Sequence, residues 1–552
     1  MASPSPFRSW SMPLALALLA CAVCASTWHT FGHIWDEPEH IAAGMVLIDK
    51  GVYVYDDQHP PLARLAAAIG PYLAGARSHG SKPPSGEEEG RQILYHSAAS
   101  YDTLLTLARA GMLPFLIVLV LSTWKAAERW QGQRVAAVAT LALISTPEIL
   151  GHGSIAALDM PVTALCLLSF LMLARWIESP TMLRTVFAGI AVGLAISTKL
   201  SAVPFLGLAV LVLLAVHITF NVRNHTATLF GRLGLTGVLI ALLAIVILVG
   251  VYGPKMIYLT TPDLAYSKAL DALFGHEGWW HDVGYRFASR VRMPIGVQTA
   301  TLNMLGVEWH NKVGHNAYLL GQTSLHGWWY FYLVALAVKT PLPLLLLGLP
   351  GLVILAIRGW QARQMSLLAL PLWFVAVLVF CCAYSNINIG VRHVLLLYPL
   401  LAIGAAATLD AAWRLPVRPA ARVLTAALFG WQLATAAAVY PDYLAYFNFT
   451  AGAHPERILV DSDLDWGQDL RRLSLELARR HVPMVHMAYR GTADLTRENL
   501  PPFDLLKPGQ PATGWIAADM LAMKEEPAGY AWLRSYTPVQ RVGKSIDLYY
   551  IP

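Results

Sequence analysis

The chain has 552 residues, of which 56% are apolar and 13% are charged. Ordinary soluble domains contain roughly 45–50% apolar and about 25% charged residues, so this composition excludes a purely soluble protein. The mean hydropathy of +0.50 predicts a membrane protein that crosses the bilayer many times. The net charge of +6 is scattered between the apolar segments and is not gathered on one face or tail, so we expect no nucleic-acid partner.

Long apolar runs recur along the chain and predict an all-α polytopic membrane protein with about eleven transmembrane helices. We expect the first run to stay as a membrane helix and not to be cleaved as a signal peptide, because a motif that needs membrane attachment follows it directly. All five cysteines lie inside apolar runs, which leaves no disulfide framework and no cysteine zinc site. The runs lie near residues 12–31, 108–124, 135–147, 155–177, 183–198, 200–220, 234–252, 329–355, 366–384, 393–412 and 421–440.

The positions of Lys and Arg predict the orientation. With the N-terminus inside, the short inner connections carry twelve basic residues, whereas the short outer connections carry two, Lys199 and Arg392. This asymmetry is typical of cytoplasmic loops, so we predict a multi-pass protein of the cytoplasmic (inner) membrane with a cytoplasmic N-terminus. Three polar stretches then face away from the cytoplasm, namely residues 32–107, 253–328 and 441–552.

These outer stretches also have predictable structure. Apolar residues recur with helical period at 41–48 and 62–75, which is typical of helices lying in the membrane interface. Residues 441–552 alternate strand-like runs with a helical run, which predicts a small C-terminal α/β domain. The expected organisation is a transmembrane module at residues 1–440 and an extracytoplasmic α/β domain at residues 441–552.

Two adjacent acids, Asp36 and Glu37, follow the first apolar run in the motif WDEPEH at 35–40. They either cap the N-terminus of a helix or provide a carboxylate base close to a lipid-borne substrate, and the residues alone leave both interpretations open. Later in the same loop, DDQHPPLARL carries His59 and Arg64, whose directions the double proline restricts. Taken alone, this second motif favours a structural turn.

Charged residues also stand at the predicted outer ends of the spans. Arg109 begins the second span, and Lys199 lies between the fifth and sixth spans. Such cations either extend toward lipid phosphates or hold the phosphate of a bound lipid substrate. Asp159, at the start of the fourth span, is their acidic counterpart and taken alone is a helix cap.

Three stretches resemble metal sites without matching one. Neither HEGWWHD at 276–282 nor WHNKVGH at 309–315 has a recognised zinc spacing. DSDLDWGQD at 461–469 resembles the start of an EF-hand, but Trp466 stands where that loop needs glycine and Arg472 where it needs glutamate. We therefore predict no metal and no other cofactor, and we interpret this stretch as a strand end, an acidic loop and a capped helix from about Asp465.

Several motifs together resemble a known family. WDEPEH, HPPLARL, LARAGMLPF, ALDMPVTALCLL and GLAISTKLSAVP, in this order and at these topological positions, are similar to the GT-C type glycosyltransferases that depend on a lipid carrier. Relatives of this type include the protein O-mannosyltransferases and the aminoarabinose transferase of lipid A. Further stretches at 317–345, 392–403 and 445–470 resemble bacterial members grouped as family 39, so the similarity covers most of the chain.

The resemblance implies that the chain transfers a sugar from a polyprenyl-phosphate carrier to an acceptor hydroxyl at the outer membrane face, with inversion. By position, it implies that Asp36 is the base and Glu37 its acidic neighbour, and that Arg109 and Lys199 lie near the donor phosphate. We add His59, Arg64 and Asp159 as supporting residues. The acceptor can be a glycan, a lipid or a protein, and the sugar is not determined by the sequence.

Two other classes of function stay open. A transporter or flippase of polyprenyl-linked sugars would also have many spans and buried cations, but it predicts repeat symmetry and broken helices within the membrane. An envelope scaffold that recruits partners through its tail would not need the ordered set of acids and cations.

Overall fold

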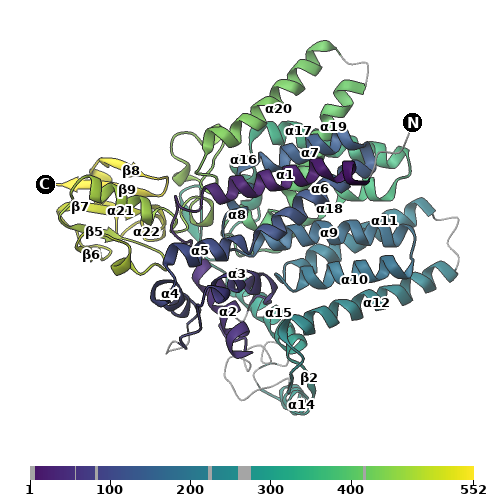
Figure 1. Ribbon diagram of the computed structural model, residues 1–552, viewed down its shortest axis with the longest axis horizontal. Coiled ribbons are helices and arrows are strands. Elements are labelled where there is room, and N and C mark those ends of the chain that lie inside the picture. The colour runs from purple at the N-terminus through teal and green to yellow at the C-terminus, as the bar shows by residue number, and fades with distance from the viewer. Residues whose placement is uncertain are drawn as a thin grey trace.

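A computed structural model describes residues 6–55, 58–80, 85–221, 227–258, 275, 277–414 and 418–552. The long helices run along the horizontal axis of Figure 1, and α9, α10, α11 and α12 pack beside one another. The helices of this bundle are α1 (Pro6–Ser26), α6 (Leu113–Gln131), α7 (Gln133–Ile144), α8 (Pro147–Gly153), α9 (Asp159–Glu178), α10 (Met182–Ile196), α11 (Ala202–Asn221), α12 (Ala227–Tyr252), α16 (Phe331–Lys339), α17 (Leu342–Gln361), α18 (Met365–Tyr384), α19 (Leu397–Arg414) and α20 (Pro419–Val439).

All eleven apolar runs are helical over most of their length where the structure describes them. Within the residues that the structure describes, seven helices are long and apolar enough to cross a membrane, and the bent pair of α7 and α8 raises this to eight if it forms one span. The expected eleven is larger because three runs form helices that are short or more polar. The apolar part of α1 and the whole of α10 are shorter than a full span, and α19 carries Asp410 and Arg414 near its end.

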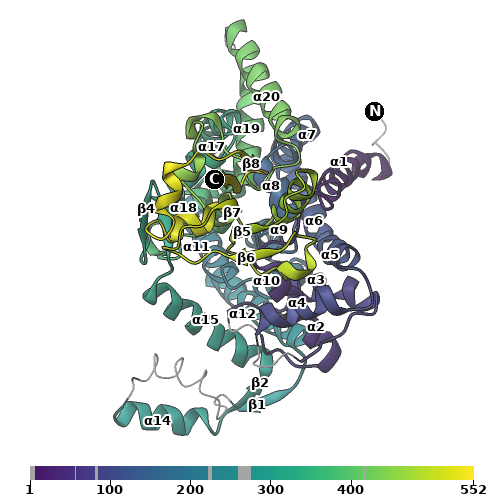
Figure 2. The same cartoon turned by 90° about the vertical axis from the view of Figure 1, so that its left-hand side faces the viewer.

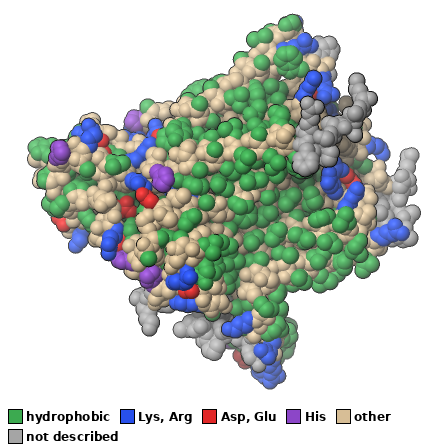
Figure 3. All heavy atoms as spheres, in the orientation of Figure 1, with side chains coloured by type: hydrophobic (Ala, Val, Ile, Leu, Met, Phe, Trp, Pro, Cys, Tyr) green, Lys and Arg blue, Asp and Glu red, His purple; other side chains and the backbone are tan. Residues whose placement is uncertain are grey.

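The surface distribution of side chains agrees with a multi-pass membrane protein. Figure 3 shows hydrophobic side chains covering the visible flank of the bundle, with Lys, Arg, Asp, Glu and His gathered toward its two ends. A continuous apolar flank of this kind is expected where lipid tails replace water as the solvent.

The loop after α1 folds into four helices, α2 (Glu37–Lys50), α3 (Leu62–Leu73), α4 (Gly86–His96) and α5 (Tyr101–Ala110). The last of them, α5, continues into α6. Glycine allows α2 and α3 to pack closely, because a Cβ at Gly44 would lie 2.1 Å from the carbonyl oxygen of Arg64. Apolar residues of α2 to α5 form a small core of their own around Ile41, Met45 and Leu104. Helices were expected at 41–48 and 62–75, and both are present.

The second outer loop contains α14 (Trp279–Ala288) and α15 (Ile295–Val313). Two short antiparallel pairs of strands accompany them, β1 (Met256–Tyr258) with β2 (Arg292–Pro294), and β3 (Ala317–Leu319) with β4 (Gln322–Ser324). Part of the HEGWWHD motif lies outside the described residues. WHNKVGH at 309–315 forms the last turn of α15 and the two residues after it.

The C-terminal region contains a five-stranded sheet in the order β6-β5-β7-β9-β8, which confirms the expected small α/β region. Strand β5 pairs in parallel with β6 and β7, and β9 pairs antiparallel with β7 and β8. Helix α21 packs its apolar face on the sheet, with Leu473 and Leu477 against Val485 and Leu548. The elements are α21 (Leu470–Arg479), β5 (Val485–Ala488), β6 (Phe503–Leu505), β7 (Gly514–Asp519), α22 (Met520–Glu525), β8 (Gln540–Val542) and β9 (Ile546–Ile551).

The sheet lies at one end of the helical bundle, beside the loop helices α2 to α5, as Figures 1 and 2 show. Contacts that join the parts include a bidentate ion pair between Arg471 on α21 and Asp102 on α5, and a hydrogen bond that Tyr95 on α4 donates to Glu498. Most of the predicted site residues lie at this end. The helix expected from about Asp465 begins at Leu470, after a short 3-10 turn, η5 (Asp461–Asp463).

Candidate active site

Asp36 stands directly before α2, where the chain turns from the end of α1 into the loop helices. Its side chain does not cap the helix, so this structure does not support the capping interpretation of Asp36. The carboxylate oxygen Oδ2 instead accepts a hydrogen bond of 2.7 Å from Nη1 of Arg392. With 26% of its side chain exposed, Asp36 remains open to a reactant.

Arg392 belongs to the 3-10 turn η2 (Val391–Val394) between α18 and α19, 356 residues away from Asp36 in the chain. Its Nη1 also lies 3.9 Å from Oδ2 of Asp159, and Oδ1 of Asp159 accepts a bond of 2.7 Å from Nζ of Lys199. Asp36, Arg392, Asp159 and Lys199 therefore form one network of alternating charges, which we call the ion-pair network. Among the described residues, Nε of Arg392 has no hydrogen-bond partner.

The electrostatic surroundings keep Arg392 charged. Burial alone would lower the pKa of its guanidinium, but the carboxylates of Asp36, Asp159 and Asp461 outweigh burial and raise the pKa. Arg392 is also stacked, with its guanidinium carbon 4.2 Å from the centre of the Trp466 ring. The network thus holds a permanent cation beside the exposed carboxylate of Asp36.

Glu37 is not bonded to this network and forms a buried ion pair with Arg109. Its two carboxylate oxygens accept bonds of 2.8 Å from Nε and Nη2 of Arg109, and they also accept the backbone N–H groups of Ile34 and Ala156. Burial raises the pKa of the Glu37 carboxyl, but the charge and hydrogen bonds of Arg109 outweigh burial and lower it. The pair is anionic and cationic at neutral pH.

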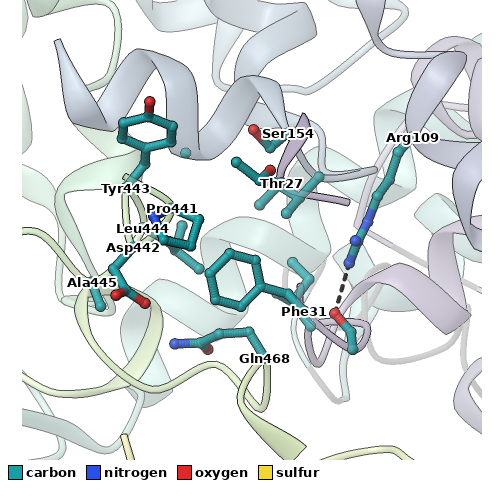
Figure 4. Close-up of a pocket in the computed structure, with 14 residues that line it drawn as sticks. Thr27, Phe31, Arg109, Ser154, Pro441, Asp442, Tyr443, Leu444, Ala445 and Gln468 are labelled. Carbon is teal, nitrogen blue, oxygen red and sulfur yellow. Dashed lines mark hydrogen bonds between the residues drawn. The ribbon is translucent and has the colours of Figure 1, made fainter. Parts of the chain in front are cut away.

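Arg109 is only 1% exposed, and two further N–H groups donate to the backbone carbonyls of Trp28 and Gly32. Figure 4 shows Arg109 at the edge of an open pocket, which Phe31 and Pro441 also line. The expected convergence of two acids with Arg109 and Lys199 is therefore found in part. The structure brings Asp36, Asp159 and Lys199 together, whereas Glu37 and Arg109 form a separate pair.

His59 lies close to the ion-pair network, and its imidazole ring is neutral there. Burial, reinforced by the nearby cation of Lys199, lowers the pKa of His59 to about 3. Among the described residues its Nδ1 has no hydrogen-bond partner, so the neutral ring has a polar atom available. Arg64 lies further back, where it donates to the hydroxyl of Tyr53 at 2.8 Å and approaches Glu39 at 3.9 Å.

Two residues that shape this site were not predicted as site residues. Arg392 had a signal, because it is one of two basic residues in the short outer connections, but the sequence gives no indication that it meets Asp36. Trp466 was noted only as a departure from an EF-hand. No group of three or more His, Cys, Asp or Glu side chains comes together for a metal within the part of the chain that the structure describes.

Comparison with known proteins relates part of the sequence to one family. The sequence model of the dolichyl-phosphate-mannose-protein mannosyltransferase family matches residues 53–262. None of the curated proteins compared with the chain matches it.

Several solved structures resemble the chain at low identity. ArnT from Cupriavidus metallidurans bound to undecaprenyl phosphate is 13% identical, with 97% of each chain covered and a TM-score of 0.46. The Archaeoglobus fulgidus oligosaccharyltransferase AglB, in complex with an inhibitory peptide and a dolichol-phosphate, is 12% identical over 99% of this chain and 75% of its own, with a TM-score of 0.49. The sugar-donor-bound Pmt1-Pmt2 complex of S. cerevisiae is 14% identical over 45% of this chain and 34% of its own, with a TM-score of 0.36. The family match confirms the resemblance to GT-C glycosyltransferases over residues 53–262, which include His59, Arg64, Arg109, Asp159 and Lys199.

Proposed function

We propose that the chain is a membrane glycosyltransferase that moves a sugar from a polyprenyl-phosphate carrier to an acceptor hydroxyl. The observation that carries this proposal is the ion-pair network, in which four distant segments bring an accessible carboxylate and two cations together. The family match to residues 53–262 supports the same reaction class.

The cations Lys199 and Arg392 would hold the donor phosphate. A polyprenyl phosphate leaves as a stable anion, so neutralising its charge assists departure and a strong general acid is not required. Arg392 has an unpartnered Nε among the described residues, and Lys199 retains two ammonium protons beyond its bond to Asp159. Asp159 would hold the two cations at a fixed separation by binding both.

Asp36 would act as the base. It removes the proton from the acceptor hydroxyl, the hydroxyl oxygen forms a bond to the anomeric carbon, and the bond between that carbon and the phosphate oxygen breaks. The electron pair leaves with the polyprenyl phosphate. A single displacement of this kind inverts the anomeric configuration.

The other predicted residues would support this arrangement. We assign Glu37 and Arg109 the role of fixing the turn that carries Asp36, because Arg109 donates hydrogen bonds to Glu37 and to the backbone carbonyls of residues 28 and 32. His59, neutral beside the network, would offer a hydrogen bond to the donor or acceptor. Arg64 would stabilise the packing of α3 through Tyr53 and Glu39.

We further propose that the protein resides in the cytoplasmic membrane with the end of the bundle that carries the sheet on the outer side. The excess of Lys and Arg in the short connections on the opposite side supports this orientation. The donor would then be a polyprenyl-phosphate sugar from the membrane, and the acceptor a glycan, lipid or protein outside the cytoplasm. We propose that residues 441–552 form the extracytoplasmic domain and that no metal takes part.

Purified protein in detergent tests this proposal. It is incubated with a panel of undecaprenyl-phosphate hexoses and pentoses and with an envelope extract from cells that lack the protein. Sugar transfer to an extract component, lost in Asp36→Asn while undecaprenyl phosphate still binds, supports a transferase. Because detergent removes the membrane barrier, a transporter would produce no new glycoconjugate. Full transfer by Asp36→Asn would overturn the assignment of the base.

A further inference from the structure

The acidic segment from Asp461 to Gln468 has no role in the reaction proposed above, yet it is almost entirely buried. Asp463 and Asp465 are each 1% exposed and Trp466 is 3% exposed. The carboxylates do not converge as metal ligands would, because Asp463 accepts the backbone N–H of Val391 and Asp465 accepts that of Leu521. The segment therefore binds other parts of the chain.

On one side it holds the turn that carries Arg392. The ring of Trp466 stacks under the guanidinium, with 4.2 Å from its centre to the guanidinium carbon. Oδ1 of Asp463 accepts a bond of 3.0 Å from the N–H of Val391, the residue directly before Arg392. The Ser462 hydroxyl donates to the carbonyl of Ile389. Both the side chain and the backbone of this turn are thereby fixed.

Glycine makes this contact possible. Gly390 has φ of 138°, and a Cβ there would lie 2.3 Å from Oγ of Ser462. A larger residue would force the turn and the acidic segment apart. The sequence NIGVRH at 388–393 thus has glycine at the position where the backbone approaches Ser462 closely.

On the other side the same segment holds the turn that carries Asp36. The carbonyl of Trp466 accepts a bond of 2.8 Å from the N–H of Trp35, and the carbonyl of Gln468 accepts one of 3.0 Å from the N–H of Gly32. Trp466 therefore contacts the residue before the proposed base through its backbone and the proposed phosphate-binding cation through its ring.

The segment is itself anchored to the helical bundle. Lys339, at the end of α16 and 1% exposed, donates to the carbonyl of Asp463 at 2.6 Å and to that of Leu444 at 2.8 Å. A buried ammonium with these acceptors resists displacement, because breaking either bond would leave a charge poorly solvated.

We propose that the segment Asp461–Gln468 is the positioning element of the site, and that Trp466 sets the orientation of Arg392 toward the donor phosphate relative to Asp36. This inference rests on the proposed function. It assigns no chemical step to the segment: Trp466 and Asp463 act through Arg392 and are positioning residues.

Binding of undecaprenyl phosphate to the full-length protein in detergent tests the proposal. In Trp466→Leu, loss of a buried stacking contact should weaken binding about tenfold, whereas Trp466→Phe, which keeps an aromatic face, should lose less. Trp515→Leu is the matched control, because Trp515 on β7 also lies near an arginine, Arg480, at 5.8 Å. This control should bind as the wild type does.

A second pair of variants removes the backbone contact. Asp463→Ala should weaken binding, and Asp463→Asn should restore it, because the amide oxygen can still accept from Val391. Thermal unfolding of each variant is measured in parallel. If Asp463 served folding alone, Asp463→Ala would lower the Tm, and Asp463→Asn would not restore binding. If Trp466→Leu does not fold, the Asp463 pair decides.

The outcomes separate this inference from the proposed function. If Arg392→Ala loses binding while Trp466→Leu and Asp463→Ala bind as the wild type does, the positioning role is overturned and the phosphate assignment stands. If Arg392→Ala itself binds normally, the proposed function of the site fails.

Discussion

Asp36 and Glu37 are adjacent in the chain, but the structure predicts that substitution by the matching amide affects a different property at each. Glu37→Gln should lower stability, and Asp36→Asn should lower the rate of catalysis. Glu37 is fully buried and accepts two bonds from Arg109 and two from backbone N–H groups. In Glu37→Gln, the NH2 group of the new side chain would face N–H groups, which are also donors. Arg109 would stay buried without its counter-charge. Breaking a buried pair from one side costs about 3–5 kcal/mol.

Asp36→Asn should cost much less stability. The carboxylate is partly exposed, and Arg392 keeps Asp159 at 3.9 Å, so we expect a loss of about 1 kcal/mol or less. Its effect should fall on catalysis, because a general base contributes about 10²–10⁴-fold to the rate. Thermal unfolding in detergent, followed by tryptophan fluorescence, should show a large fall in Tm for Glu37→Gln and a small one for Asp36→Asn.

The pH dependence checks the cause. Arg109 holds the pKa of Glu37 below its ordinary value of 4.5, so the stability from this pair is present above that value and is lost as the pH falls through the lower pKa of the folded state. The difference in Tm between wild type and Glu37→Gln should therefore stay constant from neutral pH down to about pH 5 and shrink below it. An unchanged Tm in Glu37→Gln, or an equal fall in Asp36→Asn, would refute this account.

Three further predictions concern the ligand site. Lys199→Met should weaken binding of undecaprenyl phosphate about tenfold or more, because a hydrogen bond to a charged group is lost, whereas Lys199→Arg should retain most of it; equal affinities would contradict the role of Lys199. Because burial lowers the pKa of His59 to about 3, the ring is neutral around neutral pH, and the pH profile of transfer there should have the same shape in His59→Gln. An inflection near pH 6.5 that His59→Gln removes would show otherwise. Chelation with EDTA should leave transfer unchanged, and activity that is lost and then restored by a divalent ion would show that a metal is needed.

The sequence predicts the character of this protein better than the partners of its charged residues. Apolar runs are local, so the helices and the C-terminal α/β region follow from composition and period. Asp36, Asp159 and Lys199 stand out because charge is costly next to a membrane. Arg392 could not be linked to Asp36, because the contact joins residues 356 positions apart and depends on how the bundle closes.

The pairing of Glu37 with Arg109 was missed for a related reason. Residue types alone place two acids and two cations in one site, but only the three-dimensional path of α2 and α5 decides which acid meets which cation. The same holds for the span count, because short helices such as α10 depend on their neighbours and not on their own length to remain within the bundle.

The bond between Asp36 and Arg392 implies an order of events. A donor phosphodiester that accepts a bond from Arg392 competes with Asp36 for that guanidinium, so a seated donor would free the carboxylate to accept a bond from the acceptor hydroxyl. Before that, the Asp36 carboxylate is bonded to Arg392. Product-inhibition kinetics should therefore show the lipid-linked donor binding before the acceptor and the lipid phosphate departing last.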